Sequence, residues 1–307
     1  MKSKKIIIGS RGSKLALIYA ERACSKILET SSDFEIEEVV IKKIKTSGDI
    51  NQKDRLSDVG GKGLFLKQIE NELLEDKIDI AVHALKDMPS QETDGLLTNC
   101  FLERCDPREV LISKNNILFS ELCSNSVVGT SSFRREFQLK KIRKDLTYKL
   151  IRGNVDTRIK KLNEGLYDAI ILSYAGINSL GLEDKISQTF SISEIIPSAG
   201  QAVVALQCKK NNDIITELLQ RINHQPTHNC MLAERNVLKV LEGDCETAIG
   251  ATSSIKNNQI ILEAELFSLD GEQRFYHKSS KEIKSAALLG LEVGEILKKE
   301  SKNSYKK

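Results

Sequence analysis

Positively charged side chains recur at the starts of predicted helices, each directly after a predicted strand. A helix N-terminus already carries a partial positive charge, so a cation there costs about 0.3–1 kcal/mol. In an open α/β sheet these strand ends form the mouth where ligands bind. The repeated cost therefore indicates a ligand with several negative charges. The cations are Arg11, Lys62, Arg134, Arg135, Arg152 and Arg158.

The choice of arginine supports this interpretation, because the chain has 33 Lys and only 13 Arg. Where lysine is the default cation, an arginine more often stands where a planar fork binds a carboxylate through two nitrogens. The alternative is that each one is a solvated surface charge. If Arg134 and Arg135 serve only a ligand, replacing either should leave the stability of the free protein nearly unchanged.

Asp87 follows a buried apolar strand expected at 78–83 and comes just before Met88 and Pro89. A carboxylate at the C-terminal end of such a strand is well placed for acid–base catalysis. The alternative is an ordinary turn aspartate. His83 points inward on the same strand, and we expect it to be a core histidine that supports the site.

Cys245 differs from the other six cysteines because it lies in a polar Glu-Gly-Asp-Cys-Glu loop between a helix and a strand. A thiol there can act as a nucleophile or as an attachment point, whereas a buried cysteine behaves as a small hydrophobe. The sequence has no C-x-x-C pair and no H-E-x-x-H spacing. We therefore expect neither a disulfide framework nor a metal site.

The composition is that of a globular protein, with 40% hydrophobic and 29% charged residues. The length of 307 residues suffices for two or three domains. No stretch approaches 18 apolar residues and no signal-peptide core is present, so we expect a soluble, cytoplasmic protein without a membrane partner. The net charge of +3 is too small for nucleic-acid binding by bulk electrostatics.

Strands and helices alternate over the first two thirds of the chain, which predicts parallel α/β sheets. The strand–loop–helix arrangement occurs twice, at 5–90 and 126–175, and indicates two similar lobes. The expected strands are 5–9, 35–45, 78–83, 127–129, 147–151 and 168–172, and the expected helices are 14–29, 64–75, 133–142 and 155–163.

The pattern changes after about residue 220 to that of an α+β module. Leu269-Asp270-Gly271-Glu272 lies between two apolar segments and predicts a hairpin. The expected elements are helices at 213–222, 228–241 and 284–299 and strands at 259–268 and 273–278.

Taken together, these segments resemble the porphobilinogen deaminase (hydroxymethylbilane synthase) family over nearly the whole chain. Each motif is short, but their number, order and spacing make the set specific. They are SRGSKLAL (10–17), VGGKGLF (59–65), IAVHALKDMP (80–89), CDPREV (105–110), VGTSSFRREFQL (128–139), RGNVDTR (152–158), YDAIIL (167–172), PSAGQ (197–201), AERNVLKVLEGDC (233–245) and IG (249–250).

The resemblance implies an α/β fold with two periplasmic-binding-protein-like α/β lobes and a C-terminal α+β domain. Domain 1 would comprise residues 1–102 and 203–220, domain 2 residues 103–202, and domain 3 residues 221–307. The implied protein is a monomer.

The resemblance also implies a transferase of haem biosynthesis that joins four porphobilinogen molecules head to tail, with loss of ammonia, into hydroxymethylbilane. Its dipyrromethane cofactor would be attached covalently to Cys245. Asp87 would be the catalytic aspartate, assisting loss of the amino group and stabilising positive charge on the pyrrole nitrogens. Each pyrrole carries an acetate and a propionate, so the growing chain is the polyanion that the helix-start cations anticipate.

Further residues fall on positions that contact cofactor or substrate in the family, and Lys62 falls on a loop that can close over the cleft. The contacting positions are Arg11, Ser13, Lys86, Thr130, Ser132, Arg134, Arg135, Arg152 and Arg158.

Four residues depart from the family pattern. Ala84 stands where a serine is common, and Ser179 stands where some members have an arginine. Ala202 replaces a glycine near the hinge, and Asp244 replaces the glycine before the cysteine. None of these changes removes the aspartate, the cysteine or the main arginines, so we expect an active enzyme.

Two other classes of function fit the sequence less well. A non-enzymatic two-lobed anion-binding protein would need neither Asp87 nor Cys245, and would normally carry an export signal or a DNA-binding segment. A phosphate-ester enzyme would need a metal-binding carboxylate cluster or a Walker sequence, and neither occurs.

Overall fold

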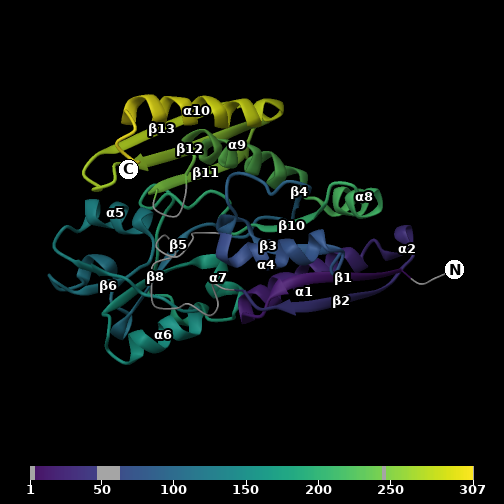
Figure 1. The fold of residues 1–307 in the computed structure, drawn as a ribbon. Helices are drawn as coiled ribbons and strands as arrows, with labels where there is room; N and C mark the ends of the chain where they lie inside the picture. The colour runs from purple at the N-terminus through teal and green to yellow at the C-terminus, as the bar shows by residue number, and fades with distance from the viewer. Residues whose placement is uncertain (1–3, 47–62, 244–246, 307) are drawn as a thin grey trace.

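The computed structural model describes residues 4–46, 63–243 and 247–306 (Figure 1). Its elements form three sheets with helices packed on them. The N-terminal lobe and the second lobe lie at opposite ends of the view, and the C-terminal domain lies above both (Figure 1). No helix within the described ranges has the length and hydropathy that crossing a bilayer requires.

The first lobe is a five-stranded sheet in the order β2-β1-β3-β10-β4. β1 runs parallel to both β2 and β3, whereas β10 runs antiparallel to β3 and β4. Helices α1 and α8 pack on one face and α4 on the other. The bounds are β1 (Lys4–Arg11), α1 (Lys14–Leu28), α2 (Ser31–Phe34), β2 (Ile36–Ile44), α4 (Gly63–Leu74), β3 (Ile80–Ala84), η2 (Leu85–Asp87), β4 (Leu96–Phe101), β10 (Val204–Lys209) and α8 (Asp213–Ile222).

The second lobe repeats this strand order as β7-β6-β8-β5-β9. Here α5 covers one face and α6 and α7 cover the other. The bounds are β5 (Glu109–Ser113), η3 (Lys114–Asn116), η4 (Phe119–Glu121), β6 (Val127–Gly129), α5 (Phe133–Ile142), β7 (Thr147–Lys149), α6 (Val155–Asn163), β8 (Ala169–Ser173), α7 (Tyr174–Ser179), η5 (Glu183–Lys185) and β9 (Gln188–Thr189).

The shared strand order confirms the prediction of two similar lobes. The prediction of parallel sheets is confirmed for β2-β1-β3 and β7-β6-β8, but it is wrong for one strand of each sheet. β5 and β10 run antiparallel to their neighbours in the two sheets. Each of them begins just after the chain has crossed from the other lobe, without a helix of its own lobe before it. Parallel neighbours need such a crossover helix, so these strands enter in the opposite direction.

The C-terminal domain is a three-stranded antiparallel sheet covered by α9 and α10. Two glycines allow the helices to approach closely: a Cβ at Gly290 would lie 2.1 Å from the carbonyl oxygen of Ala233, and one at Gly294 would lie 2.7 Å from Cβ of Val240. The bounds are α9 (Gln225–Leu241), β11 (Ile249–Lys256), β12 (Gln259–Phe267), β13 (Arg274–Glu282), η6 (Ile283–Ser285) and α10 (Ala286–Ser301).

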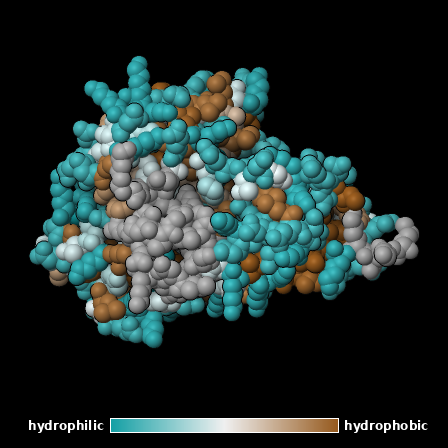
Figure 2. Space-filling view, viewed as in Figure 1, coloured by the Kyte–Doolittle hydropathy of each residue, from teal (hydrophilic) through white to brown (hydrophobic). Residues whose placement is uncertain are grey.

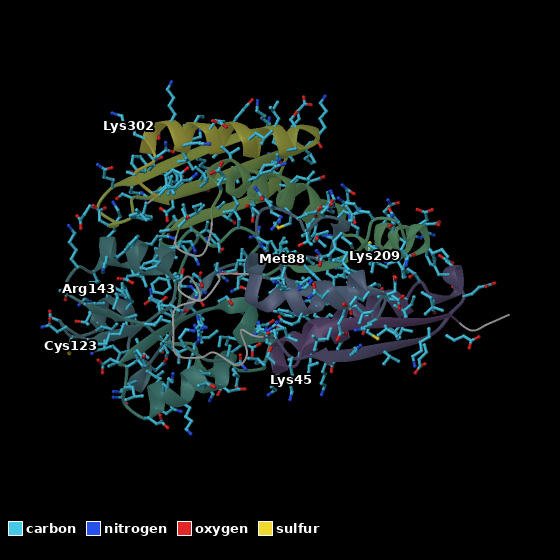
Figure 3. The ribbon with its side chains drawn as sticks, in the orientation of Figure 1. Lys45, Met88, Cys123, Arg143, Lys209 and Lys302 are labelled. Atoms are coloured by element: carbon cyan, nitrogen blue, oxygen red, sulfur yellow. The ribbon has the colours of Figure 1, made fainter. Side chains whose placement is uncertain are left out.

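The predicted hairpin between β12 and β13 is confirmed, with Gly271 at φ +76° in its turn. Its tip packs on the ring of Phe137 in α5, which joins the C-terminal domain to the second lobe. Met88 belongs to a buried cluster that joins the first lobe to the C-terminal domain, and Figure 3 places it where these two parts meet.

Hydrophilic residues cover most of the face seen in Figure 2, with apolar residues in scattered patches. Two buried clusters lie inside the first and second lobes, between each sheet and its helices. A third fills the C-terminal domain and continues into the first lobe, where it includes Leu66, Phe101 and Ala205.

Candidate active site

A cavity of about 70 Å³ lies at the C-terminal end of β3. Asp87 reaches it because η2 turns the chain immediately after the strand, with the Met88 amide donating to the Leu85 carbonyl. The start of α1 forms the facing wall. The lining residues are Arg11, Ser13, Leu15, Ala16, Tyr19, Leu66, Val82, His83, Ala84 and Asp87.

His83 is 7% exposed and lines this cavity, in agreement with its expected place in the core beside the site. Nε2 of His83 lies 3.2 Å from Oε1 of Gln207. Burial lowers the pKa of His83 to about 4, although the nearby Glu70 carboxylate and the Gln207 hydrogen bond act in the opposite direction. The ring is therefore neutral near pH 7.

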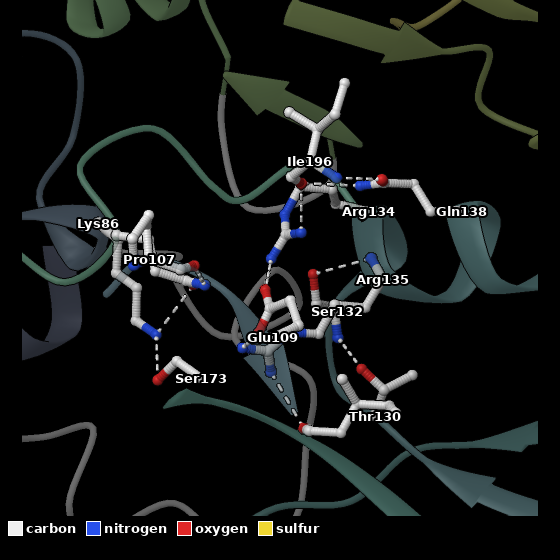
Figure 4. Close-up of polar contacts among 12 residues, drawn as sticks. Lys86, Pro107, Glu109, Thr130, Ser132, Arg134, Arg135, Gln138, Ser173 and Ile196 are labelled. Atoms are coloured by element: carbon white, nitrogen blue, oxygen red, sulfur yellow. Dashed lines mark hydrogen bonds and ion pairs between the residues drawn. The ribbon is translucent and has the colours of Figure 1, made fainter. Parts of the chain in front are cut away.

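Arg134 and Arg135 form a buried ion-pair cluster with Glu109 at the start of α5 (Figure 4). Nη2 of Arg134 lies 2.6 Å from one carboxylate oxygen of Glu109, and Nη2 of Arg135 lies 2.8 Å from the other. Their Nη1 atoms donate to the carbonyl oxygens of Ile196 and Ile171. Burial raises the pKa of Glu109, but the two guanidiniums outweigh it and bring the pKa to about 2.

These contacts correct the expectation that Arg134 and Arg135 would matter little to the free protein. Glu109 is fully buried, and removing either arginine leaves its charge poorly compensated. The sequence showed Glu109 within CDPREV, but its role depends on β5 lying in the middle of the second sheet, and β5 was not expected as a strand.

The side chain of Lys86, which follows β3 of the first lobe, extends toward the second lobe. Its Nζ is 3.5 Å from Oγ of Ser173 at the end of β8 and 3.5 Å from Oε1 of Gln201 (Figure 4). Burial and, to a smaller extent, the positive charge of Arg135 lower the pKa of Lys86 to about 8, while Asp87 acts in the opposite direction. Lys86 is thus a cation in a region already rich in positive charge.

Two more arginines extend this positive region. Nε of Arg158 donates to the carbonyl oxygen of Gly153 at 2.8 Å. Burial, together with the positive charges of Arg135 and Arg152, lowers the pKa of Arg158 to about 10. Buried Nε of Arg135 has no hydrogen-bond partner among the described residues. Clustered guanidiniums with an unused donor fit a ligand that carries carboxylates.

The hydroxyl residues of the site also begin the helices. Oγ of Ser13 accepts from the Ala16 amide at 3.3 Å, which caps α1. Oγ of Ser132 accepts from the Arg135 amide, which caps α5, and Oγ1 of Thr130 accepts from the Ser132 amide. At the starts of α1 and α5, the capping hydroxyl is therefore held beside the free backbone N–H groups of the helix.

The structure brings Asp87, Arg11, Ser13 and His83 to one cavity. It brings Arg134, Arg135 and Lys86 to one polar cluster, with Arg152 and Arg158 close enough to influence its pKa values. Lys62, Asp244 and Cys245 lie outside the described residues.

Matches to protein-family models cover most of the chain. A model described as "Porphobilinogen deaminase, dipyromethane cofactor binding domain" matches residues 6–217. A second, described as "Porphobilinogen deaminase, C-terminal domain", matches residues 228–299.

Curated relatives carry the same name over nearly their full length. Porphobilinogen deaminase of Staphylococcus epidermidis is 40% identical over 303 residues, covering 97% of this chain and 96% of the relative. That of Bacillus cereus is 42% identical over 270 residues, covering 87% and 86%.

Among solved structures, the chain is similar to the probable amino-acid ABC transporter extracellular-binding protein ytmK from Bacillus subtilis, with a TM-score of 0.42 and 16% identity over 72% of this chain and 92% of that one. It is also similar to YhfZ from Shigella flexneri, with a TM-score of 0.38 and 12% identity over 79% and 93%.

Proposed function

This chain belongs to the porphobilinogen deaminase family, and from that premise we propose how its residues perform the family's reaction. The protein is a transferase of tetrapyrrole (haem) biosynthesis. It joins four porphobilinogen molecules head to tail, with loss of one ammonia for each, and hydrolysis then releases the product as hydroxymethylbilane. The observation that carries the residue assignment is the cavity that holds Asp87 beside a buried cluster of cations.

The cationic cluster supports a binding role toward dipyrromethane and substrate carboxylates. Arg135 has an unused buried donor, and the pKa values of Lys86 and Arg158 are lowered by burial and by neighbouring positive charge. A ligand carboxylate placed among them would relieve this repulsion. The residues proposed to bind carboxylates of the cofactor or substrate are Arg11, Ser13, Lys62, Lys86, Thr130, Ser132, Arg134, Arg135, Arg152 and Arg158.

Cys245 is the proposed attachment point of the dipyrromethane, through a thioether. When bound, the cofactor supplies the pyrrole to which the first substrate is joined. The role of the protein is then to hold carboxylates and to orient the reacting pyrroles.

Asp87 is the proposed catalytic residue. It lies in the cavity wall at the end of η2, and its charge influences His83, Lys86 and Arg158. A carboxylate there can hold the proton that assists loss of the amino group and can stabilise positive charge that develops on a pyrrole nitrogen.

The proposed domain boundaries are 1–102 with 203–220, 103–202 and 221–307, and the return of β10 to the first sheet supports the split first domain. We further propose that the enzyme is a cytoplasmic monomer. The cysteines of the described ranges are free thiols, which suits a reducing compartment.

The intact mass of the purified chain tests the cofactor assignment. We expect the chain to be heavier than its sequence by two pyrrole units, with the adduct on Cys245 after peptide mapping. An adduct on another cysteine contradicts the attachment site. A fully active chain without any adduct contradicts the cofactor.

Replacing Asp87 by Asn tests the catalytic assignment, because it keeps the size and removes the charge. We expect cofactor attachment to survive and turnover of porphobilinogen to fall by about 10²–10⁴-fold. Turnover close to that of the parent enzyme would leave Asp87 with a structural role only.

A further inference from the structure

A buried network of hydrogen-bonded polar side chains runs from the cavity through β3 and β10 to helix α4. His83 in β3 contacts Gln207 in β10 through Nε2, at 3.2 Å from Oε1. Nε2 of Gln207 donates to Oε1 of Glu70 in α4 at 3.0 Å, and Oγ1 of Thr93 donates to the other Glu70 oxygen at 2.8 Å. Gln207 is fully buried, and Glu70 is 9% exposed.

This hydrogen-bond network determines which nitrogen of His83 carries the hydrogen. A carboxylate only accepts hydrogen bonds, so the amide nitrogen of Gln207 faces Glu70 and its oxygen faces His83. An amide oxygen donates nothing, so Nε2 of His83 must be the donor. In a neutral imidazole with its hydrogen on Nε2, Nδ1 has a lone pair and can only accept.

The charged groups around the ring do not change this assignment. They are Glu70 on α4, Asp87 after β3 and Arg11 at the end of β1. Burial outweighs the two carboxylates and keeps the pKa of His83 at about 4, so the ring stays neutral near pH 7. Since Nε2 is engaged by Gln207, Nδ1 is the nitrogen left for a ligand in the cavity that His83 lines.

We propose that Nδ1 of His83 accepts a hydrogen bond from a pyrrole N–H bound beside Asp87, and that Gln207 and Glu70 are positioning residues that hold His83 in this acceptor form. This inference rests on the proposed function of the cavity. A pyrrole N–H is a donor and never an acceptor, because the nitrogen lone pair belongs to the aromatic ring. His83 offers an acceptor to it without adding a second negative charge next to Asp87.

Nitrogen NMR on the holoenzyme labelled with ¹⁵N-histidine reads the tautomer directly. The chain has 4 histidines, and the His83 signals are assigned by their loss in His83→Asn. His228 is a built-in reference for a ring whose Nδ1 carries a hydrogen, because its Nδ1 lies 3.0 Å from the Asn99 carbonyl oxygen. We expect His83 to be neutral with the hydrogen on Nε2, and its Nδ1 signal to move when porphobilinogen is added.

Comparing three states separates the two sources of a pyrrole N–H. A shift of Nδ1 between the cofactor-free protein and the holoenzyme assigns the donor to the cofactor. A shift only when porphobilinogen is added assigns the donor to the substrate. No shift in either comparison overturns the proposal, as does a His83 ring with its hydrogen on Nδ1.

Two variants test the positioning residues. In Glu70→Gln the side-chain amide of Gln207 can rotate and exchange its oxygen and nitrogen, so we expect a mixture of the two His83 tautomers. Gln207→Met removes the contact with His83 and keeps the side-chain volume. In His83→Phe the acceptor is lost, and we expect kcat/KM to fall about tenfold or more, as for one hydrogen bond. Melting temperatures identify any variant that does not fold, in which case Glu70→Gln and the wild-type spectra decide.

Retention of the parent kcat/KM by a folded His83→Phe overturns the proposal. A wild-type protein that does not turn over porphobilinogen at all overturns the proposed function instead, and with it the ligand named here. The histidine tautomers are read without turnover, so the two failures are distinguishable.

Discussion

Glu109 gives Arg134 and Arg135 a structural role in addition to the proposed binding role. The carboxylate is fully buried and receives one charged hydrogen bond from each guanidinium. Desolvated ion pairs contribute little in net terms, but leaving one partner unpaired is costly.

We predict that Arg134→Leu lowers the free energy of unfolding of the cofactor-free protein by about 3–5 kcal/mol. Urea unfolding of that form measures the change without a contribution from bound ligand. The matched control removes the whole cluster, with leucine at positions 109, 134 and 135, and should regain much of the loss. Unchanged stability in Arg134→Leu would contradict the importance of the Glu109 pair.

The lowered pKa of Lys86 makes a prediction about pH. A lysine with a folded-state pKa of about 8 is charged below that pH and loses its charge as the pH rises through it. A nearby ligand carboxylate raises this value. We therefore expect kcat/KM for porphobilinogen to fall at about pH 8 or above.

The control for this prediction is Lys86→Arg, which stays charged throughout the range. The titration of the substrate is the same for both enzymes, so the ratio of their kcat/KM values isolates Lys86. A ratio that does not change with pH would show that Lys86 does not titrate in this window.

At the scale of elements, the connection that returns the chain from the second lobe holds a strained residue. Ala202 has φ +68°, a left-handed conformation that costs a residue with a Cβ about 1–2 kcal/mol. Its carbonyl oxygen accepts from the Cys105 amide at 3.0 Å, so the two connections between the lobes are hydrogen-bonded to each other at this point.

We predict that Ala202→Gly raises the free energy of unfolding by about 1 kcal/mol, since the gain exceeds the entropy that glycine adds to the unfolded chain. Gly200→Ala is the matched control of opposite sign, because Gly200 has φ +72° and its Cβ would lie 2.7 Å from Cγ of Leu85. Chemical unfolding of both variants measures the two changes in the free energy of unfolding. A less stable Ala202→Gly would mean that the strain is small.

The longer helices were predictable from sequence because their periodicity and caps are local, whereas the short α2 and α7 were not predicted. α1 and α5 begin where Ser13 and Ser132 cap them. β5 and β10 were not predicted. β5 is buried throughout and β10 up to its last residue, so neither shows an alternation of buried and exposed positions. Without β5 in place, the pairing of Glu109 with the arginines of α5 could not be predicted either.

The site was predictable in its residue types but not in its contacts. Asp87 could be placed from the strand before it, and the arginines from their positions at helix starts. The hydrogen-bond network from His83 through Gln207 to Glu70 joins residues more than a hundred positions apart in the sequence. Only the register of β3 with β10 brings them together.

At the scale of the whole molecule, one buried ion pair links all three parts. Glu234 in α9 is fully buried and receives Nη1 of Arg104 at 2.6 Å. It also accepts from the amides of Gly200 and Ser253. Nε of Arg104 donates to the Gln201 carbonyl, so the pair connects both inter-lobe connections to the C-terminal domain.

We predict that Glu234→Gln lowers the free energy of unfolding by about 3 kcal/mol or more and separates the melting of the C-terminal domain from that of the lobes. Scanning calorimetry records both effects. Glu29→Gln is the control, because the exposed Lys26–Glu29 pair contributes about 0–1 kcal/mol. A single unshifted transition in Glu234→Gln would show that the domains are coupled elsewhere.

The interlaced strand order sets the sequence of events during synthesis. The first sheet receives β10 only after the entire second lobe has been made, and among the described strands β4 borders β10 alone. The strands of the second sheet all lie between residues 109 and 189, so that sheet can close as soon as its own residues have left the ribosome. The lobe that emerges first must therefore be the second to finish folding. Until then β3 keeps an open edge, and that is the interval in which the nascent chain is most exposed to wrong strand pairing.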